Sequence, residues 1–299
     1  MIRAAEEPRD AVYRLVEGRH GRFLCNPNDR YVGRSLIAYG EWGEAEVRLF
    51  ERVLRSGDVA VEVGSNIGSH TAPIYKAVGP GGTVHAFEPQ RLVHQLLCAN
   101  LALNDCFNVH AHRAAVGDTV TWARICDVPP QHEFNYGALA VDLDLGGDSS
   151  MDDVPLTTID DMGLERIDFI KVDAEGLDLQ VLEGAKLSLA AHRPALFVEA
   201  EARTGQALFE FLRANGYNGY WYCSQLFDAD NFNAAAENIW RDLGYTLISL
   251  DVFAVPREAG WEIAGLPPME DWAGFDAGHA PISADNFRTG LHVVRPPTG

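Results

Sequence analysis

The sequence predicts an α/β fold in which helices cover both faces of a largely parallel sheet. First, the β-branched run Val59–Val63 leads through a glycine-containing turn into a helical segment. Second, strand-like and helical segments keep alternating from residue 83 to residue 118. Third, two more apolar runs, 166–176 and 194–201, flank another helical segment. Such alternation is typical of βαβ units, which place their strands in parallel.

The composition narrows the functional classes. The chain has 299 residues and a formal net charge of −19, from 43 acidic and 24 basic residues. This charge disfavours binding to nucleic acids or to anionic membrane surfaces. The five cysteines form no C-x-x-C pair, no apolar run approaches about 18 residues, and the first ten residues lack an apolar core of a signal peptide. We therefore expect a cytoplasmic protein without membrane insertion; a homo-oligomer is left open.

The segment before the first core strand divides into two parts. Residues 1–40 are predicted to be an N-terminal elaboration, with short strands at "AVYRLV" and "GRFLCN". The main domain is expected over 41–256. It begins with a helix over Glu41–Asp58, in which Val47, Phe50 and Val53 recur at helical spacing.

The first core strand and its turn form the centre of the predicted domain. Gly64 and Gly68 follow the strand and let the backbone turn and approach a ligand. A helix is expected over 69–78, then a strand over 83–89, a helix, and a third strand over 108–118. A strand, a glycine turn and a helix N-terminus together form a nucleotide-type cofactor site in α/β proteins.

The second half adds a flap and a tail. Residues 119–157 are rich in Gly, Asp and Pro and predict an inserted hairpin or flap. A fourth strand, one crossover helix over 177–192, a fifth strand and a helix over 204–215 follow. Two further strands are expected at "GYWYC" and "YTLISLDVFAVP", and residues 257–299 are expected to pack on the domain as a tail.

The residues around the turn favour one cofactor. The G-x-x-x-G spacing, with Asn66 inside it, differs from the G-x-G-x-x-G of dinucleotide sites. Glu62 precedes Gly64 by two residues, and Glu88 ends the next strand, where a carboxylate can grip a ribose diol. Two carboxylates would repel a pyrophosphate but suit a ribose and a sulfonium. S-adenosylmethionine therefore fits better than NAD or ATP.

The chain resembles the FkbM family of S-adenosylmethionine-dependent methyltransferases. The resemblance rests on "VEVGSNIGSHT", "FEP", "AAVGD", "NYGAL", "IDFIKVDAEGLDLQVLEGA" and "RPALFVEAE", and spans roughly Tyr39–Glu201. It implies a seven-stranded, Rossmann-like class I methyltransferase sheet whose last strand pair is antiparallel. It also implies O-methylation of sugars, glycolipids or polyketide-type metabolites.

The same resemblance implies a set of cofactor contacts. Glu88 would hold the ribose hydroxyls, Asp173 would contact the cofactor amine or the acceptor, and Tyr39 and Glu41 would lie near the mouth of the site. The other implied contacts are Gly64, Ser65, Asn66 and Gly68 at the methionine part and ribose, and Ala115 and Val116 along the adenine. Glu62 joins these cofactor candidates because it stands beside the turn.

Three residues are candidates for the base that a hydroxyl acceptor requires. Asp173 and Glu175 follow the fourth strand, where catalytic groups of such sheets collect. The alternative is that Asp173 caps the next helix and Glu175 pairs with a neighbour such as Lys171. His70 begins the helix of the cofactor turn and is either a base or a partly exposed helix residue.

The sequence specifies the residues that would contact a metal or the methyl acceptor less closely than those that would contact the cofactor. Asp173, Glu199 and Glu201 lie on adjacent predicted strand ends and could hold Mg²⁺; satisfied strand-end carboxylates are the alternative, and we assign no resident metal. Asn135 and Tyr136 in the flap are candidate substrate contacts, unless the flap is a plain edge hairpin.

The sequence thus predicts an O-methyltransferase that acts on a hydroxyl of a small molecule or glycan. A methyltransferase with a carboxylate, amine or peptide acceptor is the second hypothesis. The third is a non-catalytic cofactor-binding partner protein, against which the presence of Gly64, Gly68, Glu88 and Asp173 argues.

Overall fold

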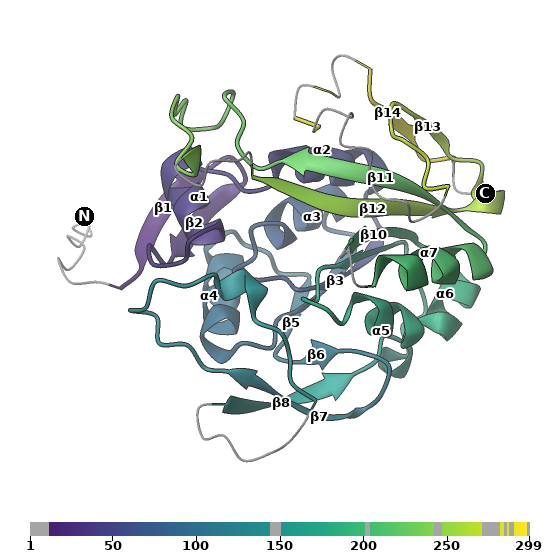
Figure 1. Cartoon of the computed structure of the whole chain (residues 1–299), viewed down its shortest axis with the longest axis horizontal. Coiled ribbons are helices and arrows are strands. Elements are labelled where there is room, and N and C mark those ends of the chain that lie inside the picture. Colours follow the sequence, from purple (N-terminus) through teal and green to yellow (C-terminus); the bar gives the residue numbers. More distant parts are fainter. Residues whose placement is uncertain are drawn as a thin grey trace.

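A computed structural model describes most of the chain as one α/β assembly (Figure 1). The described residues are 12–143, 151–200, 204–241, 247–270, 282–283, 286 and 290–297. Among them, no helix has the length and apolar character needed to cross a membrane.

The central sheet has seven strands in the order β11-β12-β10-β9-β3-β4-β5. Five of them run parallel, and β12 runs antiparallel to both of its neighbours, β10 and β11. The predicted class I methyltransferase sheet, with its antiparallel last pair, is thereby confirmed. The strands are β3 (Val59–Val63), β4 (Thr83–Phe87), β5 (Val109–His112), β9 (Phe169–Val172), β10 (Ala195–Glu199), β11 (Tyr217–Gln225) and β12 (Ile248–Pro256).

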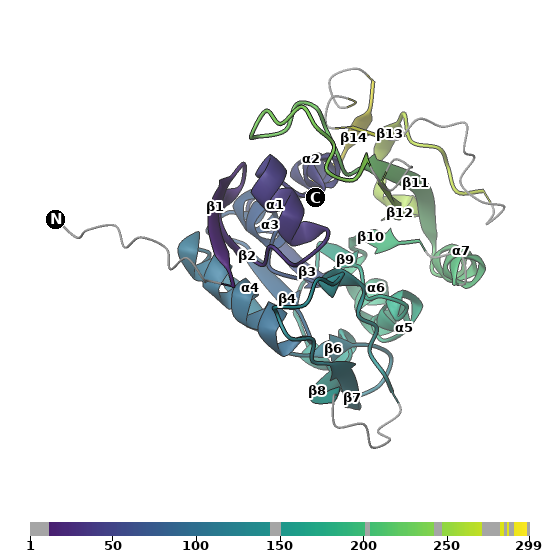
Figure 2. The same cartoon turned by 60° about the vertical axis from the view of Figure 1, so that its left-hand side comes forward.

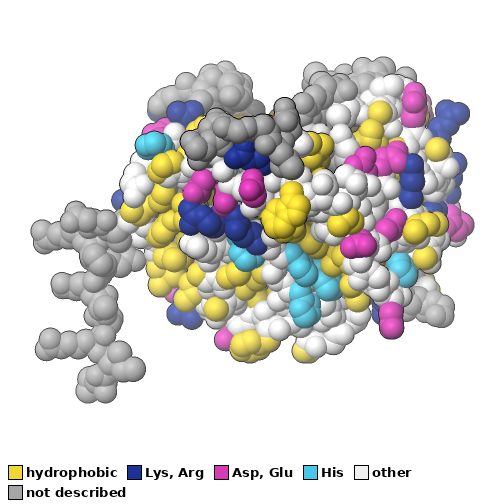
Figure 3. Space-filling model, turned by 90° about the horizontal axis from the view of Figure 1, so that it is seen from below, with side chains coloured by type: hydrophobic (Ala, Val, Ile, Leu, Met, Phe, Trp, Pro, Cys, Tyr) yellow, Lys and Arg dark blue, Asp and Glu magenta, His cyan; other side chains and the backbone are white. Residues whose placement is uncertain are grey.

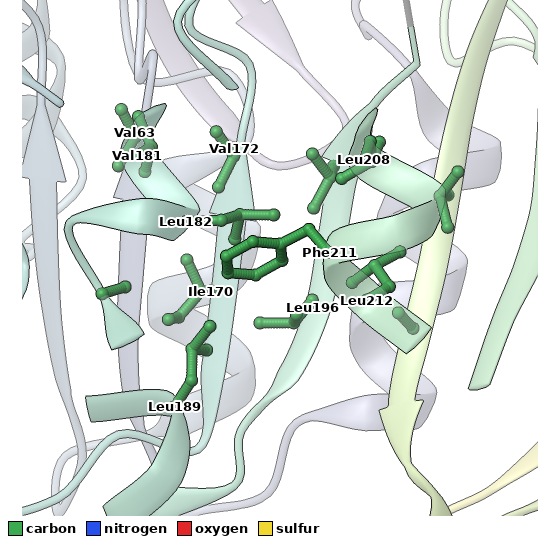
Figure 4. Packing of buried hydrophobic residues seen from close by; sticks show 14 of the residues in the cluster. Val63, Ile170, Val172, Val181, Leu182, Leu189, Leu196, Leu208, Phe211 and Leu212 are labelled. Carbon is green, nitrogen blue, oxygen red and sulfur yellow. The ribbon is translucent and has the colours of Figure 1, made fainter. Parts of the chain in front are cut away.

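Helices cover both faces of this sheet (Figures 1 and 2). Side chains alternate along each strand, so Phe169 and Phe197 pack under one layer of helices while Ile170 and Leu196 pack under the other. In the second layer, the Phe211 ring lies among aliphatic side chains of the strands and of α5 (Figure 4). One layer contains α2 (Glu44–Val53), α3 (Thr71–Val78) and α4 (Arg91–Leu103); the other contains α5 (Asp178–Glu183), α6 (Lys186–His192) and α7 (Gly205–Ala214).

The prediction of a single crossover helix over 177–192 is wrong, because the chain forms two helices there, α5 and α6, with a break between them. Gly184 stands at the break, and a Cβ atom there would lie 2.0 Å from the Gly117 carbonyl oxygen. The close approach of these two backbones leaves no room for a side chain at position 184.

The additions surround the sheet. An N-terminal hairpin confirms the two short strands expected there, and a small helix follows it. The flap segment contributes the antiparallel strands β7 and β8, which form a three-stranded sheet of order β6-β8-β7 with the preceding strand β6. These elements are β1 (Arg14–Gly18), β2 (Gly21–Cys25), α1 (Val32–Tyr39), β6 (Ala115–Val116), β7 (Thr121–Cys126), η1 (Tyr136–Ala138), β8 (Met151–Thr157), η2 (Asp160–Met162), η4 (Arg257–Ala259), β13 (Glu262–Ala264) and β14 (His292–Val294).

Candidate active site

A cavity of about 470 Å³ opens at the carboxyl ends of the central strands. Its volume lies in the range of small-molecule and cofactor sites. Residues that follow β3, β4, β9 and β10 line it, together with parts of the N-terminal elaboration, the flap and β12. The cavity is therefore where a doubly wound sheet is expected to bind a ligand.

Gly64 brings three strand ends together at the centre of this cavity. Its φ of 80° is in the left-handed region, and a Cβ atom would lie 1.9 Å from the Asp173 carbonyl oxygen. The backbone N–H groups of Gly64 and Ser65 both donate to the Phe87 carbonyl, at 3.0 and 2.9 Å. The absence of a side chain at Gly64 thus lets the turn pack directly against the backbone of Asp173. Gly68 does not line the cavity; its φ is 89° and it packs against Leu97 of α4.

Glu88 lies in the cavity wall with both carboxylate oxygens engaged. Oε2 accepts a hydrogen bond from the Asn66 N–H at 3.0 Å, and Oε1 accepts one from the Gln90 N–H at 2.8 Å. The side chain is buried, and burial raises its pKa to about 7. Each oxygen keeps a second lone pair, so Glu88 can still accept hydrogen bonds from a diol. Ala115 and Val116 also line the cavity, as expected for an adenine wall.

Glu62 is a buried carboxylate at the floor of the cavity. Its Oε2 accepts from the Thr71 hydroxyl at 2.6 Å, whereas Oε1 has no hydrogen-bond partner among the described residues. Burial raises the pKa of Glu62 to about 7. An unpartnered buried oxygen is costly, and a cationic ligand in the cavity would relieve that cost.

His70 lines the same cavity as a neutral imidazole. It is buried, and burial, followed by the charge of Lys171, lowers its pKa well below the ordinary value. Its Nε2 lies 3.6 Å from Glu46 Oε2 and has no hydrogen-bond partner in the described part of the chain. The Phe50 ring packs against it edge-on. His70 therefore presents a neutral imidazole in the cavity wall.

Lys171 is a cavity residue that the sequence did not identify as functional. Its buried ammonium lies 3.2 Å from Asp173 Oδ2. Burial acts to lower its pKa, but the carboxylates of Asp173, Glu62 and Glu46 raise it above the ordinary value. The only available signal was a lysine inside an otherwise apolar buried strand.

At the end of β9, the capping role that was one alternative for Asp173 belongs to another acidic residue. Asp178, rather than Asp173, accepts from the N–H groups of Ala174 and Gly176, at 2.8 and 3.3 Å. Lys171 Nζ donates to Asp173 Oδ2 at 3.2 Å. Asp173 and Glu175 both line the cavity, so both remain in place to contact a ligand.

Three carboxylates converge beside this strand end. Oxygen atoms of Asp173, Glu175 and Glu199 lie within 4.8 Å of one another. Glu199 Oε2 is buried without a partner among the described residues, and burial, followed by the charges of Asp173 and Glu175, raises the pKa of Glu199 to about 10. Oxygen donors of this kind suit Mg²⁺. Glu201, the third residue of the expected metal set, lies outside the described residues.

The two flap candidates separate in the structure. Asn135 lines the cavity, and its Oδ1 accepts from the Gly137 N–H at 3.2 Å. The Tyr136 side chain does not line the cavity in this structure, because it is buried and its hydroxyl donates to the Pro129 carbonyl at 2.8 Å. Its carbonyl accepts from Gln90 Nε2 at 2.6 Å and so ties the flap to the end of β4.

The sequence also did not predict an aromatic wall on the N-terminal side of the cavity. Tyr31 and Trp42 line the cavity, and Trp240 supports both, with ring centroids 6.4 Å away in each case. Tyr39 packs behind Trp240 at 5.5 Å, and Glu41 pairs with Arg19 at 2.7 Å. Tyr39 and Glu41 thus support the mouth of the cavity without lining it.

Comparisons with known proteins point to one family. The sequence matches the family model described as the methyltransferase FkbM domain over residues 62–218. Methyltransferase sdnD of Sordaria araneosa is 30% identical over 161 residues, which cover 44% of this chain and 61% of that relative.

Solved structures show more distant likeness. Methyltransferase FkbM from Methylobacillus flagellatus aligns with a TM-score of 0.43 and 20% identity, over 66% of this chain and 43% of that chain. M. jannaschii TYW2, solved in complex with AdoMet, aligns with a TM-score of 0.43 and 12% identity, over 83% of this chain and 89% of that chain.

Proposed function

This chain belongs to the FkbM methyltransferase family, and from that premise we propose that it transfers the methyl group of S-adenosylmethionine to a hydroxyl oxygen of a sugar, glycan or secondary metabolite. The family match covers more than half of the 299 residues and includes the glycine turn, Glu88 and the β9 strand end. The match shows the family, whereas the transfer from S-adenosylmethionine and the acceptor are our proposal.

The cavity fits this cofactor. When bound, S-adenosylmethionine supplies an electrophilic methyl group on a sulfonium. Gly64 lines the cavity, and the free lone pairs of Glu88 would accept the ribose hydroxyls. Asp173 would hold the cofactor amine while Lys171 fixes its carboxylate. Acidic side chains outnumber the single lysine of this wall, which suits a cationic ligand.

The observation that carries the hydroxyl acceptor is the unpartnered, neutral Nε2 of His70. A hydroxyl must lose its proton as its oxygen is methylated, and a positioned base accelerates such a step by about 10²–10⁴-fold. His70 would take this proton, and Glu46, at 3.6 Å from Nε2, would stabilise the imidazolium that forms. Asp173 is engaged with Lys171, so His70 is the better base.

One alternative acceptor has its own support. Glu199 keeps a buried oxygen without a partner among the described residues, and an amine acceptor could satisfy it. A carboxylate acceptor is disfavoured because the carboxylates of Asp173 and Glu175 line the same cavity and would repel it. We assign no resident Mg²⁺, although Asp173, Glu175 and Glu199 could hold one.

A labelling experiment separates these acceptors. The protein is incubated with methyl-labelled S-adenosylmethionine and matched alcohol, phenol, amine and carboxylic-acid panels, with and without EDTA. We expect label in ethers, which survive mild base and acid, and equal turnover with EDTA. Label only in base-labile esters or in methylamines would overturn the hydroxyl acceptor. Loss of turnover in EDTA with recovery in Mg²⁺ would show that the carboxylate cluster holds a metal.

A further inference from the structure

Three histidines stand on one face of the sheet edge, away from the cofactor cavity. His85 lies on β4, and His110 and His112 lie two residues apart on the edge strand β5. The strand register pairs His85 with His110, and His112 with Phe87, so all three imidazoles project from the same face. Viewed from below, histidine side chains gather at the molecular surface (Figure 3).

The imidazole rings lie in contact. The planes of His85 and His112 differ by 14°, with centroids 5.5 Å apart, and His110 stacks on His85 at 5.1 Å. His85 Nδ1 and His112 Nε2 are 3.3 Å apart. Two nitrogens bound at about 2.0–2.1 Å to a tetrahedral zinc ion are separated by about 3.3–3.4 Å. The two atoms therefore already have the separation of a bidentate pair.

The protonation state also favours metal binding. Burial, with the neighbouring imidazoles of His112 and His110, lowers the pKa of His85 to about 4. Burial likewise lowers the pKa of His112. Both rings are thus neutral at pH 7 and can offer lone pairs without losing a proton to solvent. Both are only partly buried, and the paired strands hold their Cα atoms in place.

We propose that His85 and His112 bind one borderline divalent transition-metal ion, such as Zn²⁺ or Ni²⁺, through His85 Nδ1 and His112 Nε2. The proton now shared between these nitrogens moves to the other nitrogen of its own ring, and water completes the coordination. Nitrogen donors distinguish this site from the carboxylate cluster of the cavity.

The site would join the edge strand to the strand that ends at the cofactor. Phe87 stacks on His112 with centroids 4.5 Å apart, and Glu88 follows Phe87 directly. Since a metal that binds only the folded chain adds to its stability, the expected effect is a higher melting temperature with Zn²⁺.

The test uses the full chain, stripped with EDTA, and Ni²⁺ as the probe. Metal is titrated while the imidazole nitrogens are observed by NMR. We expect paramagnetic broadening of the His85 and His112 resonances first, at stoichiometric Ni²⁺. Calorimetry should give a dissociation constant at least tenfold weaker in His85→Asn and His112→Asn.

Two control variants test whether Ni²⁺ binding belongs to His85 and His112. His292→Asn removes an exposed histidine on β14 and should bind as wild type does, and Glu199→Gln, which weakens the carboxylate cluster, should retain the histidine site. Equal Ni²⁺ affinity in wild type and both β4–β5 variants would overturn the proposal. So would unchanged His85 and His112 resonances in wild type at stoichiometric metal, a readout that does not depend on whether the variants fold.

Discussion

Replacing Glu88 by alanine tests how the cavity holds its cofactor. In the wild type the carboxylate accepts from two backbone N–H groups, at 3.0 and 2.8 Å, and its remaining lone pairs are proposed to accept the ribose hydroxyls. Hydrogen bonds to a charged group contribute about 1.5–3 kcal/mol each. Losing the diol contacts should cost about 3 kcal/mol, which weakens binding on the order of 150-fold.

The same change acts on stability in two directions. It leaves the N–H groups of Asn66 and Gln90 without their acceptor, at about 1–3 kcal/mol each. It also removes a carboxylate whose burial raises its pKa to about 7 and whose charged form is therefore costly. We expect a net loss of about 2 kcal/mol or less, so the variant should stay folded.

The assay is calorimetric titration with S-adenosylhomocysteine, alongside urea unfolding of the same samples. Glu51→Ala is the matched control, because Glu51 is a glutamate on α2 with an exposed side chain that does not line the cavity. A folded Glu88→Ala protein with wild-type affinity would refute the placement of the ribose at Glu88.

Four further predictions concern the cavity. In Gly64→Ala the new Cβ would lie 1.9 Å from a carbonyl oxygen at a φ of 80°, so urea unfolding should show a loss exceeding about 2 kcal/mol. His70→Gln should lower kcat by about 10²–10⁴-fold while the dissociation constant of S-adenosylhomocysteine stays within threefold, or about 0.7 kcal/mol; an unchanged kcat would exclude His70 as the base. Lys171→Met leaves buried carboxylates without their cation and should cost about 3–5 kcal/mol in urea unfolding; wild-type stability would show that the ion cluster is not needed. Burial raises the pKa of Glu62 to about 7 from 4.5, so the folded chain binds more protons than the unfolded chain between these pH values. The stability that Glu62 contributes is therefore present below pH 4.5 and is lost as the pH rises through 7. The decrease in unfolding free energy from pH 5 to pH 8 should be smaller in Glu62→Gln than in the wild type, and equal decreases would contradict the assignment.

The donor half of the site could be predicted from the sequence because it is local. One strand, one glycine turn and the next strand bring Gly64 and Glu88 together within 25 residues. Parallel pairing of β3 with β4 then fixes their relation, since neighbouring strands end at the same edge. Alternating strand and helix patterns likewise predicted a parallel sheet.

The remaining cavity residues come from distant segments. Trp42 precedes a helix whose amphipathic pattern predicts burial but not which side chains reach the cavity, and Trp240 lies about 200 residues later. The sequence shows Lys171 only as part of a buried strand. In the fold, β3, β9 and α2 come together and place Glu62, Asp173 and Glu46 around it. Pattern within a segment cannot specify such packing between segments.

Tyr136 shows the same limit at a single position. The motif that contains it matches the family, yet only the fold shows that Asn135 lines the cavity while the next side chain turns toward Pro129.

A crystal structure of the chain with S-adenosylhomocysteine would test the central claim most directly. Our account predicts the ribose hydroxyls within hydrogen-bond distance of the Glu88 carboxylate, the ligand backbone against Gly64, and the sulfur facing the space beside His70. A ligand bound elsewhere, or one whose ribose does not contact Glu88, would contradict it.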